Sequence, residues 1–203
     1  MSVMPYKYLI TTSRRPTRRT RSFCKDLQQA LPRAIKINRG KMSLSDVALK
    51  AIELGANRVI LISVYKGNPG RIRFFSVSSR SFYELPPTIN IAGVKLLREF
   101  PRAKSMNPSS LFILPQAGSS SEVVLFAEAL SAALNAEVVS SELLNNLTSN
   151  SAILRLVPKS NGFCRILFTD KFGVPIGPLI NVKSAWLTLK KPFSPWSGEI
   201  VEG

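Results

Sequence analysis

The sequence predicts an α/β fold of two tandem pseudo-repeats, each a mixed sheet with helices. Apolar runs with strand-like alternation are separated by segments with helical spacing, an order typical of α/β layers. Short turn-like segments join two pairs of strands as hairpins, so antiparallel pairs are expected beside parallel ones. The order strand, helix, strand, helix, hairpin, strand occurs twice along the 203 residues, which indicates a duplicated unit.

Turn and cap residues mark the elements of the first half. Pro16 suits the first turn of a helix, because its fixed φ and missing N–H are tolerated there, and Pro32 ends that helix. Ser43 or Ser45 caps a second helix, which ends at Gly55. The expected elements are a strand at 7–12, a helix at 16–31, a strand at 33–37, a helix before Gly55, a hairpin of strands at 58–65 and 71–77 around a turn at 66–70, and a strand at 88–96.

The second half follows the same order. Residues 126–139 align with 24–37, and residues 151–170 align with 58–77. Chance similarity between α/β patterns is the alternative to a true repeat. The expected elements are a strand at 111–115, a helix at 122–135, a strand at 136–140, a short helix at 141–147, a hairpin of strands at 151–158 and 163–170, and a strand at 177–189.

Positive charge is concentrated in the first half of the chain. Residues 1–104 hold 21 basic and 5 acidic side chains, whereas residues 105–203 hold 7 of each, so the first half carries the whole net charge of +16. Self-repulsion of this size indicates a polyanionic partner such as a nucleic acid. We therefore expect one domain over residues 1–203, with a basic RNA-binding half at 1–104 and a neutral repeat half at 105–203, linked near residues 101–110.

Basic residues are densest from Arg14 to Lys25, where six of twelve positions are Arg or Lys, and no acid occurs before Asp26. At about 100° per residue, Arg18, Arg21 and Lys25 fall on one stripe of the predicted helix, opposite its apolar side. The apolar side comprises Thr20, Phe23, Leu27, Ala30 and Leu31. The stripe is therefore expected to face solvent and to be free for a polyanion.

Further donors are expected beside this stripe. Two arginines precede Pro16 in the predicted turn, and nearby hydroxyls and the free N–H groups of the first helical turn face the same edge, an arrangement that binds phosphate. Cations at a helix N-terminus oppose the dipole by about 0.3–1 kcal/mol each, which a bound polyanion reverses. Two other basic groups, at 36–41 around Gly40 and on one face of the strand at 71–77, would extend the track. The candidate RNA-binding residues are Arg14, Arg15, Arg18, Arg19, Arg21, Lys25, Arg39, Lys41, Arg71 and Arg73, with supporting hydroxyls on Thr12, Ser13 and Thr17.

Catalytic, metal and cofactor sites find no support in the sequence. It has no histidine, its 12 acids form no recognisable catalytic pair, and the phosphate-loop pattern is absent. Cys24 and Cys164 are too few for a disulfide framework or a zinc site, and both are expected in the core. No signal peptide and no bilayer-spanning stretch is seen, so we expect a soluble, cytoplasmic protein with no membrane partner. We expect no catalytic residue, no metal and no cofactor.

The stretch from Thr12 to Leu27 resembles the opening signature of the Brix-domain family, and the Asn-Arg-Gly at 38–40 and the Gly-x-Pro at 67–69 match later family motifs. A Gly-Pro-Thr segment that often follows the hairpin is replaced here by LPPTINIAG at 85–93. The matching residues are Thr12, Ser13, Arg14, Pro16, Thr17, Arg18, Phe23, Lys25, Asp26, Leu27, Asn38, Arg39, Gly40, Gly67 and Pro69.

The resemblance implies a compact, archaeal-type ribosome biogenesis factor that is not an enzyme. It implies ribosomal RNA or its precursor as the polyanion, with ribosomal proteins or other assembly factors as further partners. It also implies that each half is similar to the anticodon-binding domain of class II aminoacyl-tRNA synthetases. Composition leaves two alternatives open: a tRNA-binding, anticodon-type module, and a protein-interaction scaffold with an acidic partner.

Overall fold

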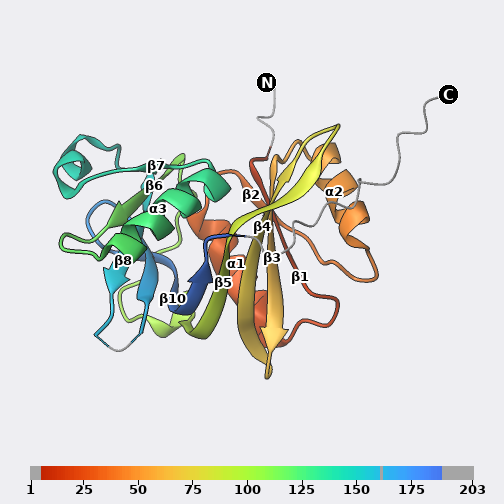
Figure 1. The fold of residues 1–203 in the computed structure, drawn as a ribbon, viewed down its shortest axis with the longest axis horizontal. Helices are drawn as coiled ribbons and strands as arrows, with labels where there is room; N and C mark the ends of the chain where they lie inside the picture. Colours follow the sequence, from red (N-terminus) through yellow and green to blue (C-terminus); the bar gives the residue numbers. More distant parts are fainter. Residues whose placement is uncertain (1–5, 161, 189–203) are drawn as a thin grey trace.

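One ten-stranded mixed sheet runs through the residues that the computed structural model describes, 6–160 and 162–188 (Figure 1). The strand order is β2-β1-β3-β4-β5-β10-β9-β8-β6-β7. Strands of the first half lie on the right in Figure 1 and those of the second half on the left, and the two sets meet where β5 pairs with β10 antiparallel. The two predicted sheets are therefore joined into one.

The first half contributes five strands and two helices. Parallel pairing of β1 with β2 and β3 gives way to antiparallel pairing from β3 through β4 to β5, so the sheet is mixed as predicted. The elements are β1 (Tyr8–Thr12), α1 (Arg18–Ala30), β2 (Ala34–Lys36), α2 (Leu44–Glu53), β3 (Arg58–Tyr65), β4 (Asn68–Val77) and β5 (Phe82–Lys95).

The second half has the same sequence of elements after a short 3₁₀ turn. Here β6 pairs in parallel with β7 and β8, and β8, β9 and β10 are antiparallel neighbours. The elements are η1 (Leu97–Glu99), β6 (Ser110–Pro115), α3 (Ser121–Leu134), β7 (Glu137–Val138), η2 (Ser141–Asn146), β8 (Ser151–Pro158), β9 (Cys164–Thr169) and β10 (Pro175–Trp186). The strand predicted at 177–189 extends one residue beyond the described part of the chain.

Several elements differ from the sequence prediction. The turn predicted at 66–70 is shorter, because β4 already begins at Asn68. Pro16 lies outside α1, because Thr17 is extended and caps the helix by accepting a hydrogen bond from the N–H of Thr20. Strand β5 begins at Phe82, six residues before the predicted start, and a register shift opposite β4 accommodates Pro86 and Pro87 within it. The short helix predicted at 141–147 is a 3₁₀ helix.

The largest core cluster is shared by both halves and lies under α1 and α3. It contains Phe23 and Leu27 from α1 together with Phe126 and Leu130 from α3. A smaller cluster on the other face of the sheet packs α2 against β1, β3 and β4. Both cysteines are buried as predicted, and the predicted apolar side of α1 faces the sheet.

Close packing joins the two halves through their helices. A Cβ atom added at Gly177 of β10 would lie 2.6 Å from the Cβ of Ala30 and 2.8 Å from that of Phe168, so a glycine is needed where α1 crosses β10. At the C-terminal end of α3, the hydroxyl of Tyr8 donates a buried 2.6 Å hydrogen bond to the carbonyl of Leu134. The second half therefore packs against α1, and the first half hydrogen-bonds to the end of α3.

Candidate nucleic-acid interface

The predicted basic stripe of α1 is exposed. Arg18, Arg21 and Lys25 face solvent, whereas Phe23 and Leu27 on the opposite side of the helix are buried. The buried side fixes the rotation of α1, so the three cations are held on the outer surface of the molecule. Within the described residues, none of these three side chains takes part in an ion pair.

The turn before α1 presents Arg14 and Arg15 to solvent, but its hydroxyls serve the fold. Thr17 Oγ1 accepts the N–H of Thr20 at 3.2 Å and donates to the carbonyl of Gly67 at 2.8 Å, which ties the turn to the β3–β4 hairpin. Thr12 is buried because β1 is an interior strand with a core on each face, and the N–H of Ser13 donates to Ile62. Burial of Thr12 therefore contradicts its predicted contact with a phosphate, whereas Thr17 is half-exposed with its hydroxyl engaged within the fold.

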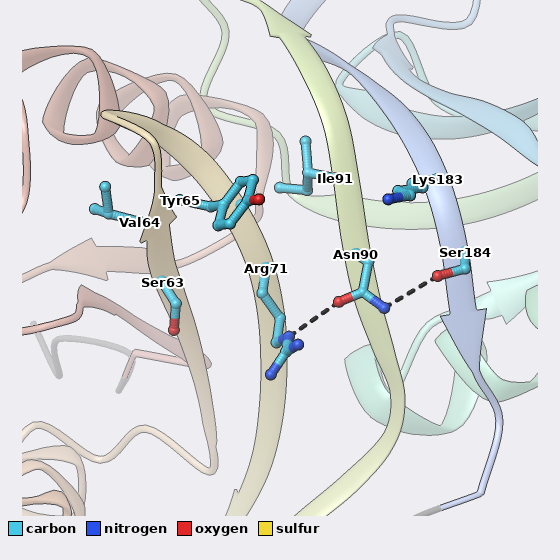
Figure 2. A pocket seen from close by; sticks show the side chains of 9 residues that line it. Ser63, Val64, Tyr65, Arg71, Asn90, Ile91, Lys183 and Ser184 are labelled. Carbon is cyan, nitrogen blue, oxygen red and sulfur yellow. Dashed lines mark hydrogen bonds between the residues drawn. The ribbon is translucent and has the colours of Figure 1, made fainter.

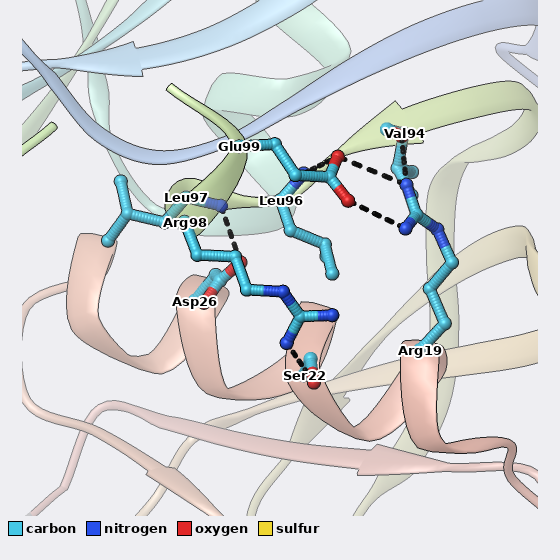
Figure 3. Close-up of polar contacts among 8 residues, drawn as sticks. All are labelled: Arg19, Ser22, Asp26, Val94, Leu96, Leu97, Arg98 and Glu99. Atoms are coloured by element: carbon cyan, nitrogen blue, oxygen red, sulfur yellow. Dashed lines mark hydrogen bonds and ion pairs between the residues drawn. The ribbon is translucent and has the colours of Figure 1, made fainter. Parts of the chain in front are cut away.

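Arg19 is not a free cation. Its Nη1 lies 2.7 Å from Oε1 of Glu99, and its Nη2 donates to the carbonyl of Val94 at 2.9 Å (Figure 3). Hydrogen bonds from Arg19 and from the N–H of Leu96 hold the pKa of Glu99 below its ordinary value. The expectation that every charge of this stretch is uncompensated is thus corrected at Arg19, because the fold brings an acid 80 residues away against it.

The segment around η1 is fastened along the same helix. Asp26 accepts a 2.8 Å hydrogen bond from the N–H of Leu97, and Nη1 of Arg98 donates to Ser22 at 3.3 Å (Figure 3). Burial raises the pKa of Asp26, although the bond from Leu97 opposes this. Arg98 and Lys25 both line a groove of about 450 Å³ between α1 and this segment. Arg98 therefore extends the basic stripe, which no local sequence pattern indicated.

Cations from three distant segments converge beside the turn. Arg39 follows β2, and its Nε donates to the carbonyl of Met42 at 3.0 Å. Burial lowers the pKa of Arg39, and repulsion from Arg14 and Arg73 lowers it further, so the three side chains lie close enough to interact. Such mutual repulsion is unfavourable in the unbound protein and would be relieved by an anion.

The two arginines predicted on β4 differ in how far their charges are paired. Arg73 forms a two-point ion pair with the nearly buried Glu84, through Nε at 2.8 Å and through Nη2, so its charge is matched inside the sheet. Arg71 is exposed, and its Nε donates to Oδ1 of Asn90 at 3.0 Å. Alternation along β4 places both arginines on the same face, as predicted, but pairing with Glu84 leaves Arg73 only partly exposed. Lys41 is exposed, as is Lys66 at the tip of the hairpin that contacts the turn.

No group of three or more Cys, Asp or Glu side chains that could hold a metal ion occurs within 6–160 and 162–188. Within the same residues, no helix is both long enough and apolar enough to cross a membrane.

No family model matches the chain, but curated proteins do. The chain is 41% identical over 100 residues to a Pyrococcus horikoshii protein described as "Probable Brix domain-containing ribosomal biogenesis protein". It is 44% identical over 94 residues to a Methanopyrus kandleri protein of the same description. The matches cover 49% and 44% of this chain and 44% and 46% of the relatives. The chain thus spans about half the length of the curated relatives it matches.

Two solved structures have similar folds. A probable ribosomal biogenesis protein from Aeropyrum pernix K1 is 27% identical with a TM-score of 0.68, and the match covers 88% of this chain and 96% of that one. Mil, an archaeal Imp4-like protein, has a TM-score of 0.56 over 89% of this chain and 99% of its own. Its identity is 23%, so this likeness shows the fold alone. The comparisons confirm the predicted resemblance to Brix-domain proteins and the mixed α/β fold.

Proposed function

We propose that this chain, as a relative of Brix domain-containing ribosomal biogenesis proteins, is a non-enzymatic ribosome assembly factor that binds ribosomal RNA or its precursor. The contact surface would be the exposed stripe of α1 and the turn before it. One observation carries the proposal: within the described residues, no ion pair involves Arg14, Arg15, Arg18, Arg21 or Lys25, although these cations crowd one short segment. A polyanion would relieve their repulsion.

Local electrostatics support this assignment. The first turn of α1 contains no acidic residue, so the dipole at its N-terminus meets cations instead of the usual carboxylates. The N-cap hydroxyl of Thr17 satisfies the N–H of Thr20, and the neighbouring N–H groups of the first turn lie beside Arg18. Guanidinium groups with backbone donors suit phosphate oxygens, which accept several hydrogen bonds at once.

The same proposal assigns different roles to the two halves of the chain. The strand orders β2-β1-β3-β4-β5 and β7-β6-β8-β9-β10 mirror each other across the β5–β10 pair, which supports a duplicated unit like the anticodon-binding domain of class II aminoacyl-tRNA synthetases. Residues 1–104 would bind RNA. Residues 105–203 would hold the first half and offer a surface to ribosomal proteins or other assembly factors.

Crosslinking the protein to RNA in cells and sequencing the attached fragments tests the proposal directly. We expect enrichment of ribosomal RNA or its precursor in the wild type, and loss of that enrichment when Arg18 and Arg21 are replaced by glutamate. Recovery of mainly tRNA would favour the anticodon-type alternative, and recovery of no RNA would favour an acidic protein partner. Cell fractionation of the same material would test the predicted cytoplasmic location.

A further inference from the structure

A polar groove lies on the open face of the sheet where the two halves meet. Ile72 of β4, Ile89 of β5 and Val182 of β10 belong to the core under α1 and α3. Because side chains alternate along strands, their neighbours Arg71 and Asn90 project from the opposite face. The groove has a volume of about 500 Å³ and is lined by Ser63, Val64, Tyr65, Gly70, Arg71, Asn90, Ile91, Lys183 and Ser184 (Figure 2).

The polar side chains of this groove form a connected row across three strands. Nε of Arg71 donates to Oδ1 of Asn90 at 3.0 Å, and Nδ2 of Asn90 donates to Oγ of Ser184 at 3.0 Å (Figure 2). These bonds hold Arg71 in place while its two terminal nitrogens stay without a hydrogen-bond partner among the described residues. The lining residues include the exposed Lys183 and no acid. The row is thus arranged to receive a negative group.

Exposed aromatic rings flank the same row. The guanidinium carbon of Arg71 lies 5.1 Å from the ring centroid of Trp186, which is two residues beyond Ser184 on β10 and 40% exposed. Tyr65, at the end of β3, is 66% exposed. Aromatic faces beside cations are the usual platform for unpaired bases, because every base can stack on them, whereas bases inside a duplex are already stacked.

We propose that this groove binds an unpaired stretch of RNA, with phosphates at Arg71 and Lys183 and a base stacked on the ring of Trp186. The inference rests on the proposed RNA-binding function and adds to it a second contact, in which Lys183 and Trp186 of the second half also take part. Arg73 and Arg71 lie two residues apart on β4, and the charge of Arg73 acts on Arg39. The groove therefore continues the basic surface onto the other face of the sheet, and single strands would be preferred over duplexes.

The sequence makes a direct optical test possible. Trp186 and Trp196 are the two tryptophans of the chain, so a Trp196→Phe variant reports on Trp186 alone. We would titrate this protein with a 12-nucleotide uridine oligomer, with an RNA duplex of equal length and with a glutamate-rich peptide. Tryptophan fluorescence would report stacking, and anisotropy of labelled RNA would report total binding. The single strand should quench the fluorescence of Trp186, with the same midpoint concentration as the change in anisotropy. The duplex and the peptide should not quench it.

Two substitutions with a matched control locate the contact. Trp186→Ala should weaken single-strand binding by about fivefold or more, the range for loss of one stacked base, while Trp186→Tyr should retain most of it. Lys183→Gln, at an exposed position that leaves the fold intact, should weaken binding about fivefold at 0.1 M salt through loss of one phosphate contact. Lys159→Gln removes the same charge from the β8–β9 turn and should change affinity less than twofold.

The outcomes separate this inference from the function on which it rests. If RNA changes the anisotropy but leaves Trp186 unquenched, and Lys183→Gln binds like wild type, the row of hydrogen bonds only joins the two halves and the groove is not an RNA site. Quenching by the acidic peptide and not by RNA would also overturn the inference, in favour of a protein ligand. Absence of any RNA binding in the unsubstituted protein would remove the proposed function itself.

Discussion

Reversing the charge of the α1 stripe should weaken RNA binding strongly without unfolding the protein. The triple variant Arg18→Glu, Arg21→Glu, Lys25→Glu replaces three exposed side chains that, in the described structure, belong to no ion pair. An acid at position 18 in the first helical turn would favour the helix dipole by about 0.3–1 kcal/mol. The free energy of unfolding should therefore stay the same or rise while RNA affinity falls.

The size of the effect follows from the number of available cations. Arg14, Arg15, Arg18, Arg21 and Lys25 are exposed, whereas Arg19 is held by Glu99. On a single strand, these five cations contribute about −3.5 to the slope of log affinity against log salt, at about −0.7 for each phosphate. Removing three contacts should make the slope shallower by about 2 and lower the affinity at 0.1 M salt by about 100-fold or more.

Fluorescence anisotropy with a labelled oligonucleotide over a range of salt concentrations measures both quantities. A control variant, Lys50→Glu, Arg80→Glu, Lys159→Glu, changes the net charge by the same amount at other places and should keep most of the slope. Equal losses in the two variants would mean that net charge, and not the stripe, governs binding. An unchanged slope in the stripe variant would refute the placement of the interface on α1.

Two further substitutions test the supports of this surface. Glu99→Gln should cost about 0.2–1 kcal/mol at pH 7, because the pair with Arg19 is partly exposed, and urea unfolding would measure it. The pKa of Glu99 is lowered in the folded state, so the ion pair stabilises the protein only where Glu99 is ionised. The difference in unfolding free energy between wild type and variant should therefore be complete above the ordinary pKa of 4.5 and shrink as the pH falls below it. A difference that does not change with pH would contradict the ion pair. Gly177→Ala should destabilise by about 1–3 kcal/mol, because its Cβ would meet Ala30 at 2.6 Å. Gly93→Ala, whose Cβ would have its nearest neighbour at 3.9 Å, is the control and should be nearly neutral.

The sequence predicted correctly which side of α1 is exposed. The spacing of Phe23 and Leu27 fixes which side of α1 is buried, and therefore which side carries Arg18, Arg21 and Lys25. That inference needs only the periodicity of one helix, so it did not depend on the rest of the fold. The start of β5 was not predicted, because the strand holds Pro86 and Pro87 at a register shift that only its partner strand reveals.

Long-range pairing could not be predicted from the sequence. Arg19 and Glu99 are 80 residues apart, and the position of Glu99 depends on how the segment around η1 lies along α1. The ion pair between Arg73 and Glu84 depends on the same register shift that β4 and β5 share. The groove was also missed, because Arg71 and Asn90 come from the first half of the chain while Lys183 and Ser184 come from the second.

The sharing of one core explains how the charge asymmetry between the halves can be tolerated. Cations on α1 repel one another, so the helix needs stabilisation that does not involve them. The second half supplies it without adding charge: Gly177 lets α1 lie closely across β10, and the antiparallel pairing of β10 protects the edge of β5. The neutral half therefore supports the basic half structurally, and residues 1–104 alone would lack part of their core and expose a strand edge.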